Sequence, residues 1–529
     1  MIVDAALTGP LPKLGVVAAG ALVALVLLAT DRRWRSAAML AALVLAPVLL
    51  LADIWHSPQL SVIHRHPLPA LAAAVVAVAA LLAVARLIGV RPWLFAPLAV
   101  FALPFRVPIQ AGGSTSNLLV PLYFVVAAGA LAVIVPTMRQ ARRRPAVRSR
   151  RPEGRHGVDP QPAPPSPFAE PTAPGAAGWV SRLLALYVVL YALQATYSAD
   201  FEKALQQMVF FYVPFALLFD LLRRVRWTPR LIRNCLALLV TMALVFSLVG
   251  FLEYATKTII LNPKLVVAND LHAYFTVNSV FFDPDIFGRF LALTMILVAV
   301  VLLYPRPPRE SAAAVGALAV LWACLVLTLS RSSLGALLVG LAVLAALRYR
   351  PSRALLVALV VIAFGAAAVA VSPKTFGLNQ GVNGASSGRG GLVSGGLSLW
   401  TDRPLWGYGS GSFITEYRRH HRQTATTLSA SHTIPITIAA EQGLIGELAY
   451  AALVVAALLC LLRRSRGDPA RCAVGAAFAA LVLHTMLYAD FLEDPVTWAL
   501  LGIGVALASA GAPARRPLSA RRGAVARSG

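Results

Sequence analysis

Long apolar stretches recur along nearly the whole chain and are separated by shorter polar connections. About fifteen of them approach the ~20 residues that an α-helix needs to cross a bilayer. Their centres lie near residues 22, 44, 77, 98, 126, 188, 214, 240, 294, 321, 340, 362, 451, 479 and 503. Within lipid, backbone polar groups can be satisfied only inside the segment itself, so each stretch is expected to be a helix. The pattern predicts an all-α polytopic membrane protein with about 15 transmembrane helices.

The connections between these stretches alternate between arginine-rich and arginine-poor. The arginine-rich set comprises residues 32–35, 139–155, 223–226, 306–309, 348–353, 463–466 and 515–527. The arginine-poor or acid-balanced set comprises residues 54–67, 106–117, 198–203, 253–283, 372–431 and 488–494. Arginine-rich connections face the cytoplasm in membrane proteins. The alternation therefore predicts an external N-terminus, a cytoplasmic C-terminus, and an external position for the long connection 372–431.

A low-complexity segment rich in arginine, proline and alanine interrupts the pattern at residues 139–177. Such a composition cannot bury a core, so a disordered cytoplasmic linker is expected. The predicted organisation follows in chain order. It is an N-terminal transmembrane bundle of about five spans (1–136), a basic linker (137–177), a second transmembrane domain (178–512), and a basic cytoplasmic tail (513–529).

Composition agrees with the membrane prediction. The 529 residues are 58% hydrophobic and only 13% charged, with a mean hydropathy of +0.74, which no soluble globular domain needs. The formal net charge of +25 would suit nucleic acid, but the arginines lie in short runs between apolar stretches, so no nucleic-acid partner is expected. Four scattered cysteines form neither a metal spacing nor an evident disulfide framework. They are Cys235, Cys324, Cys460 and Cys472.

The connection 372–431 is longer than two neighbouring spans require, and long loops are usually functional or disordered. Its glycine-rich run, 406–411, would let the backbone approach a ligand closely. Candidate substrate-binding residues in this region are Arg403, Gly407, Gly409 and Gly411. A flexible turn remains an alternative interpretation of the same run.

Two arginines are expected on the outer face, Arg331 at a tight turn between spans and Arg389 in the long loop. A guanidinium group suits a diphosphate, because its planar fork donates two hydrogen bonds and keeps its charge. We interpret both as candidate catalytic residues. For Arg331 the alternative is an arginine at the end of a span that reaches the lipid head groups.

His432 stands at the predicted outer end of the span that follows the loop. A neutral imidazole there could accept a proton from a hydroxyl nucleophile, although a lone histidine is more often structural. Glu441 lies nine residues further on, about 13 Å along a helix, so it is no direct partner of His432. A carboxylate inside a span marks either function, such as substrate binding, or a paired structural role. His484, inside another span, is ambiguous in the same way.

The sequence does not suggest a metal or a cofactor. Asp283-Pro284-Asp285 is the closest pair of acids at the mouth of a span, and it is more typical of a helix start than of a metal site. No arrangement typical of a serine hydrolase or a phosphate-binding loop is evident.

Five short motifs occur with characteristic spacing over roughly residues 180–510. They are Phe282-Asp283-Pro284-Asp285-Ile286-Phe287, Thr328-Leu329-Ser330-Arg331, Gly388-Arg389, the run from Pro404 to Phe413, and His432 followed by Glu441-Gln442-Gly443. As a set they resemble the motifs of the O-antigen ligase and O-antigen polymerase family of bacterial membrane glycosyltransferases. The chain departs from the family pattern at Asp283, Asp285, Val393 and Thr433, and it has about three more N-terminal spans than the usual twelve.

The resemblance implies a GT-C-like ligase architecture in the cytoplasmic membrane, with the active site on the external or periplasmic face. It also implies metal-independent transfer of a glycan from a polyprenyl-diphosphate carrier to a surface polysaccharide or glycolipid acceptor. His432, Arg389 and Arg331 would then be catalytic, and Arg403, Gly407, Gly409, Gly411 and Glu441 would bind substrate.

Two other classes of protein remain open. A transporter or permease of a small solute or lipid-linked glycan is also polytopic, but it should carry polar residues at the bilayer midplane in paired broken spans. A structural membrane component with an interaction loop would leave the two arginines and His432 unexplained.

Overall fold

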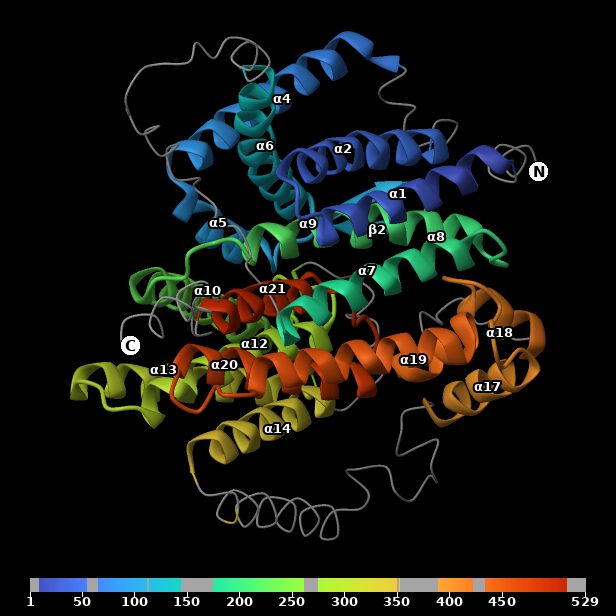
Figure 1. The fold of residues 1–529 in the computed structure, drawn as a ribbon. Coiled ribbons are helices and arrows are strands. Elements are labelled where there is room, and N and C mark those ends of the chain that lie inside the picture. Colours follow the sequence, from blue (N-terminus) through green and yellow to red (C-terminus); the bar gives the residue numbers. More distant parts are fainter. Residues whose placement is uncertain are drawn as a thin grey trace, which may run out of the picture.

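Helices dominate the computed structural model, which describes residues 9–54, 65–111, 114–143, 175–260, 275–349, 352, 389–421 and 433–510 (Figure 1). Within these ranges, 12 helical segments are long and apolar enough to cross a membrane. Two shorter apolar helices, Pro92–Ala102 and Pro495–Ala510, coincide with the spans predicted near residues 98 and 503. The span predicted near residue 362 lies outside the described residues. The prediction of an all-α polytopic membrane protein is confirmed.

The N-terminal part consists of helices and one hairpin. Its elements are α1 (Pro10–Leu28), α2 (Arg32–Ile54), α4 (Pro67–Val90), the 3₁₀ turn η2 (Pro92–Leu94), α5 (Phe95–Ala102), β1 (Val107–Ala111), β2 (Ser114–Leu118) and α6 (Val120–Arg143). The two strands pair antiparallel, with Val107 opposite Leu118. The sequence pattern did not predict this hairpin. Most side chains of α4 are left uncovered by the protein, as in a helix that faces lipid.

The second part is a larger helical bundle. It contains α7 (Ala176–Ala195), α8 (Phe201–Gln207), the π-helix η3 (Met208–Tyr212), α9 (Val213–Leu222), α10 (Pro229–Thr256), α12 (Pro284–Leu303), α13 (Pro308–Leu327), α14 (Arg331–Arg348), α17 (Arg389–Asp402), α18 (Phe413–His421), α19 (Ile434–Leu462), α20 (Pro469–Leu487) and α21 (Pro495–Ala510). Many of these helices begin with proline, whose missing N–H costs nothing in the first turn. Asp283 caps α12, as predicted, by accepting from Asp285 N at 2.7 Å.

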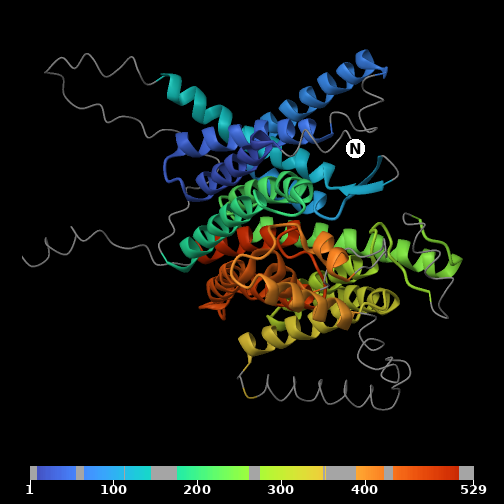
Figure 2. The same ribbon diagram turned by 90° about the vertical axis from the view of Figure 1, so that its right-hand side faces the viewer.

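The two parts share one apolar core. Helix α1 packs on α7 and α9, and α7 in turn packs on α19. Buried apolar side chains form a continuous cluster that includes Val16 of α1, Leu184 of α7 and Leu507 of α21. Figure 2 shows the resulting layers, with the N-terminal helices on one side of α7–α9 and the remaining helices on the other. The N-terminal spans therefore belong to the same bundle as the rest of the described chain.

Helices α17 and α18 lie at one end of the bundle, beside the first turns of α19 (Figure 1). Helix α19 starts at this end and runs toward the opposite end (Figure 1). The arginine-rich connections after α14 and α19, at Arg348 and at Arg463–Arg466, lie together at that opposite end, where both contact Tyr304. This separation of arginine agrees with the predicted alternation between the two sides of a membrane.

Candidate functional site

The connection between α17 and α18, residues 403–412, lies along the first half of α19. Tyr408 N donates to Ala440 O at 3.1 Å, and Gly409 N donates to Glu441 O at 2.8 Å. In the other direction, Leu444 N donates to Pro404 O at 2.8 Å. We call this arrangement of residues 404–413 and 440–445 the clasp. It fixes the polar loop to a membrane-spanning helix.

Glu441 is the centre of the clasp. Its side chain is buried, and its two carboxylate oxygens accept from Gly411 N at 2.8 Å and from Phe413 N at 3.1 Å. Hydrogen bonds from backbone N–H groups satisfy a buried carboxylate and hold the donating chain in place. These bonds support a paired structural role for Glu441, while its predicted contact with substrate remains a prediction.

The three glycines of the run adopt left-handed backbone conformations, with φ of 67° at Gly407, 98° at Gly409 and 78° at Gly411. A Cβ atom on Gly409 would lie 2.3 Å from Ser198 Cα, and one on Gly407 would lie 2.3 Å from Glu441 C. The glycines thus allow the loop backbone to pack closely against other parts of the protein, Ser198 and Glu441. Contact between these glycines and a substrate stays a prediction.

Basic and aromatic side chains surround the clasp. The exposed Arg403 places its guanidinium carbon 4.5 Å from the centre of the Tyr408 ring, and the Tyr408 hydroxyl lies 3.3 Å from His420 Nε2. Arg419 forms an ion pair of 2.5 Å with Glu416 on α18. Exposed arginines therefore lie beside a fixed loop, where they could meet an anionic ligand.

The candidate catalytic residues are all associated with helix starts. Arg331 is the first residue of α14 and is exposed, and Arg389 is the first residue of α17. His432 lies outside the described residues, and α19 begins two positions later at Ile434. The N-terminal end of a helix carries partial positive charge and free N–H groups, so an arginine there adds to an anion-binding environment.

A buried polar network holds the turn that carries Arg331. Ser332 Oγ donates to Asp285 Oδ1 at 3.2 Å, and His484 Nε2 lies 3.2 Å from the hydroxyl oxygens of both Ser332 and Ser333. The network joins α12, α14 and α20. Sequence reasoning noted His484 but did not find its partners, because the serines lie about 150 residues earlier in the chain. The repeated serines around Arg331 were the signal that could have suggested it.

An apolar cavity of about 190 Å³ lies within the bundle, between α5, α10, α12, α20 and α21. Its wall includes the buried ion pair between Arg289 Nη2 and Asp494 Oδ2, at 2.5 Å, and also Arg106. Nearly all other lining side chains are apolar, so the cavity suits a hydrocarbon chain whose polar head lies near the arginines. Sequence reasoning did not find it, because five separated elements form its wall.

Within the described ranges, no group of three or more His, Cys, Asp and Glu side chains is arranged to hold a metal ion. The arrangement that does emerge is a helical membrane protein with a fixed polar loop, arginine-bearing helix starts and an apolar cavity.

Comparison with known families agrees with this class. A family model described as O-antigen ligase matches residues 316–451, which include α14, α17, α18, the clasp and the first half of α19. Residues 316–451 are therefore similar to the O-antigen ligase family, and the resemblance noted in the sequence is confirmed over this segment. The match supports a ligase-like or polymerase-like role in membrane-associated glycan synthesis. No curated protein matches the chain.

Proposed function

We propose that the protein is a membrane glycosyltransferase that moves a glycan from a polyprenyl-diphosphate carrier to a surface polysaccharide or glycolipid acceptor. It acts at the external face of the cytoplasmic membrane and needs no metal. The observation that carries the proposal is that Arg331 and Arg389 each open a helix within the segment that matches the O-antigen ligase family.

The arginines suit the leaving group of such a reaction. When the bond between the sugar carbon and the diphosphate oxygen breaks, its electron pair stays on the diphosphate, where negative charge accumulates. Guanidinium groups and helix starts stabilise that charge without a metal ion. The apolar cavity beside Arg289 supports a lipid-borne donor, because it offers room for part of an isoprenoid chain away from water.

The acceptor supplies the oxygen atom of the new glycosidic bond. Its hydroxyl oxygen attacks the sugar carbon as the bond to the diphosphate breaks, and its proton passes to His432. The basic surface around the clasp would face the acceptor glycan.

The proposal is tested by incubating purified protein in lipid vesicles with a polyprenyl-diphosphate-linked glycan and a candidate acceptor. Transfer accompanied by release of the free carrier is the expected result. A permease would instead move the intact donor across the bilayer without consuming it, and that outcome would replace the proposal.

Lysine is not expected to replace Arg331 or Arg389. Loss of a donor that stabilises transition-state charge typically costs about 10²–10³ in rate. Since lysine keeps the charge but loses the two-pronged donation, Arg331→Lys and Arg389→Lys should each lower transfer by roughly 10- to 100-fold. Arg418→Lys, an exposed change on α18, serves as the control and should retain wild-type transfer. Full activity in both test variants would show that the two arginines do not contribute to catalysis.

The assigned sides of the membrane can be tested by labelling. Cysteine introduced at Ser386 should react with a membrane-impermeant thiol reagent on intact cells, whereas cysteine at Ser149 should react only after the membrane is opened. The arginine alternation predicts this difference. Labelling of the Ser149→Cys variant alone on intact cells would invert the assignment.

A further inference from the structure

A second, smaller pocket lies beside the first turns of α19 and is lined by both apolar and polar side chains. Its volume is about 40 Å³, enough for about three water molecules. Glutamates face it from two elements, Glu441 from α19 and Glu493 from the loop before α21. The remaining lining residues are Tyr187, Tyr191, Tyr212, Ile434, Thr437, Ile438, Gln442, Phe491 and Leu492.

The hydrogen bonds around the pocket leave one buried hydrogen-bond acceptor unsatisfied. The amide of Gln207 donates to Glu493 Oε1, and the Tyr191 hydroxyl donates to the same amide's oxygen. Gln442 Nε2 donates to the Tyr187 hydroxyl at 3.2 Å. The other end of this side chain, Gln442 Oε1, is buried and has no hydrogen-bond partner among the described residues. A buried acceptor without a hydrogen-bond partner destabilises the folded protein.

The charges around the pocket do not remove this deficit. Glu441 and Glu493 face it together, and Asp490 adds a third carboxylate next to Glu493. Lys203 on α8 is the cation that acts on both glutamates, and Asp200 also acts on Glu441. The phenols of Tyr191 and Tyr212 also interact electrostatically with Glu493. With both glutamates ionised, the pocket would hold an excess of acceptors and of negative charge.

We propose that this pocket is a proton-binding site, in which the carboxyl group of Glu493 keeps a proton and shares it in a hydrogen bond with the carboxylate of Asp490. The proton turns one surplus acceptor into a hydrogen-bond donor and so relieves the excess of acceptors around the pocket. Glu441 is the poorer carrier, because two backbone N–H groups donate to its oxygens and favour its ionised form. Glu493 accepts from a neutral side-chain amide and lies beside Asp490, so the proton resides there.

The electrostatics of the loop agree with this assignment. Burial raises the pKa of Glu493 to about 8, and the carboxylate of Asp490 raises it further against the opposing effect of Lys203. A carboxyl whose pKa is higher in the folded than in the unfolded protein contributes stability at low pH. For Glu493 this contribution is complete below about pH 4.5 and is lost as the pH rises through about 8.

The bound proton would act on the outer end of α19. When it is present, the α20–α21 loop meets α19 and η3 with a single charged carboxylate in the pocket. When the proton leaves, the carboxylates of Glu441 and Glu493 and the unsatisfied oxygen of Gln442 all line the same small pocket. The junction beside the start of α19 therefore weakens in alkaline solution, which makes Glu493 a pH-sensitive element of the bundle.

Infrared titration of the purified full-length protein in lipid tests the assignment without any substrate. The carbonyl band of a protonated carboxyl group should be present at neutral pH and should disappear with a midpoint near pH 8. In Glu493→Gln the part of this band that titrates near pH 8 should be absent. Glu202→Gln, which removes an exposed glutamate on neighbouring α8, is the matched control and should keep it.

A second variant keeps the test independent of how well Glu493→Gln folds. Gln207→Leu removes the amide that donates to Glu493, which disfavours the ionised form, so the midpoint should move to higher pH. A band that still titrates near pH 8 in Glu493→Gln, or a pH 8 midpoint that is unchanged in Gln207→Leu, would assign the proton to another group and overturn the proposal. Absence of the band from the wild-type protein at neutral pH would do the same.

Discussion

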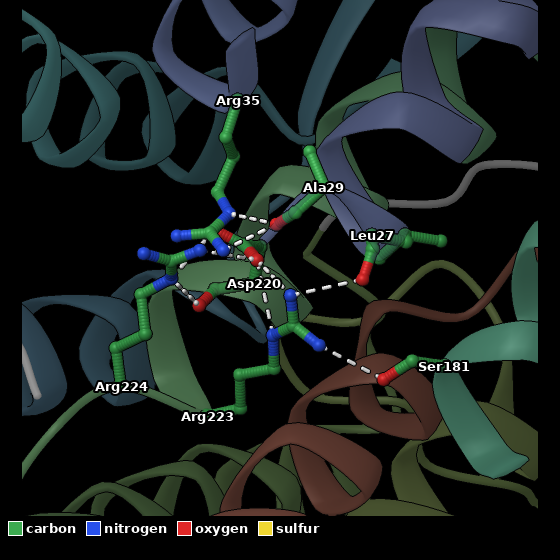
Figure 3. Close-up of polar contacts among 7 residues, drawn as sticks. All are labelled: Leu27, Ala29, Arg35, Ser181, Asp220, Arg223 and Arg224. Carbon is green, nitrogen blue, oxygen red and sulfur yellow. Dashed lines mark hydrogen bonds and ion pairs between the residues drawn. The ribbon is translucent and has the colours of Figure 1, made fainter. Parts of the chain in front are cut away.

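Replacement of Asp220 by asparagine is expected to destabilise the folded protein by about 3–5 kcal/mol, because it leaves buried arginines without their counter-charge. Asp220, at the end of α9, is fully buried. Its carboxylate lies 2.5 Å from Arg223 Nη2 and 2.8 Å from Arg224 Nε. Arg35 at the start of α2 lies beside the same carboxylate, as Figure 3 shows.

This cluster joins the N-terminal helices to the larger bundle. Arg223 Nη1 donates to Ser181 Oγ of α7 at 2.9 Å, and its Nη2 donates to Leu27 O of α1 at 3.1 Å. Arg35 Nε donates to Ala29 O at 3.1 Å. One carboxylate thus holds together the ends of α1, α2, α7 and α9. Loss of its charge should loosen the contact between the two parts of the chain as well as lower overall stability.

Thermal unfolding of purified protein measures the effect. The control is Asp31→Asn, which removes an exposed carboxylate from the neighbouring α1–α2 connection and should leave the unfolding temperature nearly unchanged. A second change should recover part of the loss, since Asp220→Asn combined with Arg224→Met removes one of the uncompensated charges. Equal unfolding temperatures for Asp220→Asn and Asp31→Asn would show that the cluster does not stabilise the fold.

The helices could be predicted from the sequence because lipid leaves the backbone few choices. A long apolar run must be helical in a bilayer, and prolines such as Pro284 and Pro469 mark where helices begin. The span near residue 503 was found at the right place, yet its helix, Pro495–Ala510, has only 16 residues. Hydropathy reports the presence of a span better than its length. The β1–β2 hairpin was missed because its strands have five residues each and carry a weak pattern.

The candidate site was less predictable, because its parts meet only in three dimensions. The sequence indicated that Gly407, Gly409 and Gly411 permit a close approach, but it gave no means to identify what approaches them. It also singled out Glu441, which follows Gly411 by 30 residues, without a partner. In the structure, the carboxylate of Glu441 accepts a hydrogen bond from the backbone N–H of Gly411. The same limit applies to His484 with Ser332, and to Glu493 with Gln207, which are 286 residues apart.

Replacement of His432 by alanine is expected to lower glycan transfer by about 10²–10⁴, the usual contribution of general-base catalysis. The prediction rests on the position of His432 in the sequence, two residues before α19 begins and within the segment that matches the O-antigen ligase family. A neutral imidazole at that point can take the proton of the attacking hydroxyl as the new bond forms. Binding of the donor, which we propose for Arg331 and Arg389, should largely survive the change.

The pH dependence of transfer gives an independent measure. The rate should fall as the pH drops below about 6.5, the ordinary pKa of imidazole, because protonated histidine cannot act as a base. This acidic loss should disappear in His432→Ala, whose residual rate no longer depends on that proton. The effect has the opposite direction to the alkaline weakening expected from Glu493, so one pH profile separates the two.

The competing interpretation is that His432 only anchors the preceding loop through hydrogen bonds. Glutamine at position 432 keeps a polar amide of similar reach but cannot take up a proton in this pH range. His432→Gln should therefore lose nearly as much transfer as His432→Ala if the imidazole is the base, while His66→Gln, an exposed change just before α4, should retain it. Near-normal transfer by a folded His432→Gln protein would remove His432 from the mechanism. Stabilisation of the leaving diphosphate by Arg331 and Arg389 would then be the main source of catalysis.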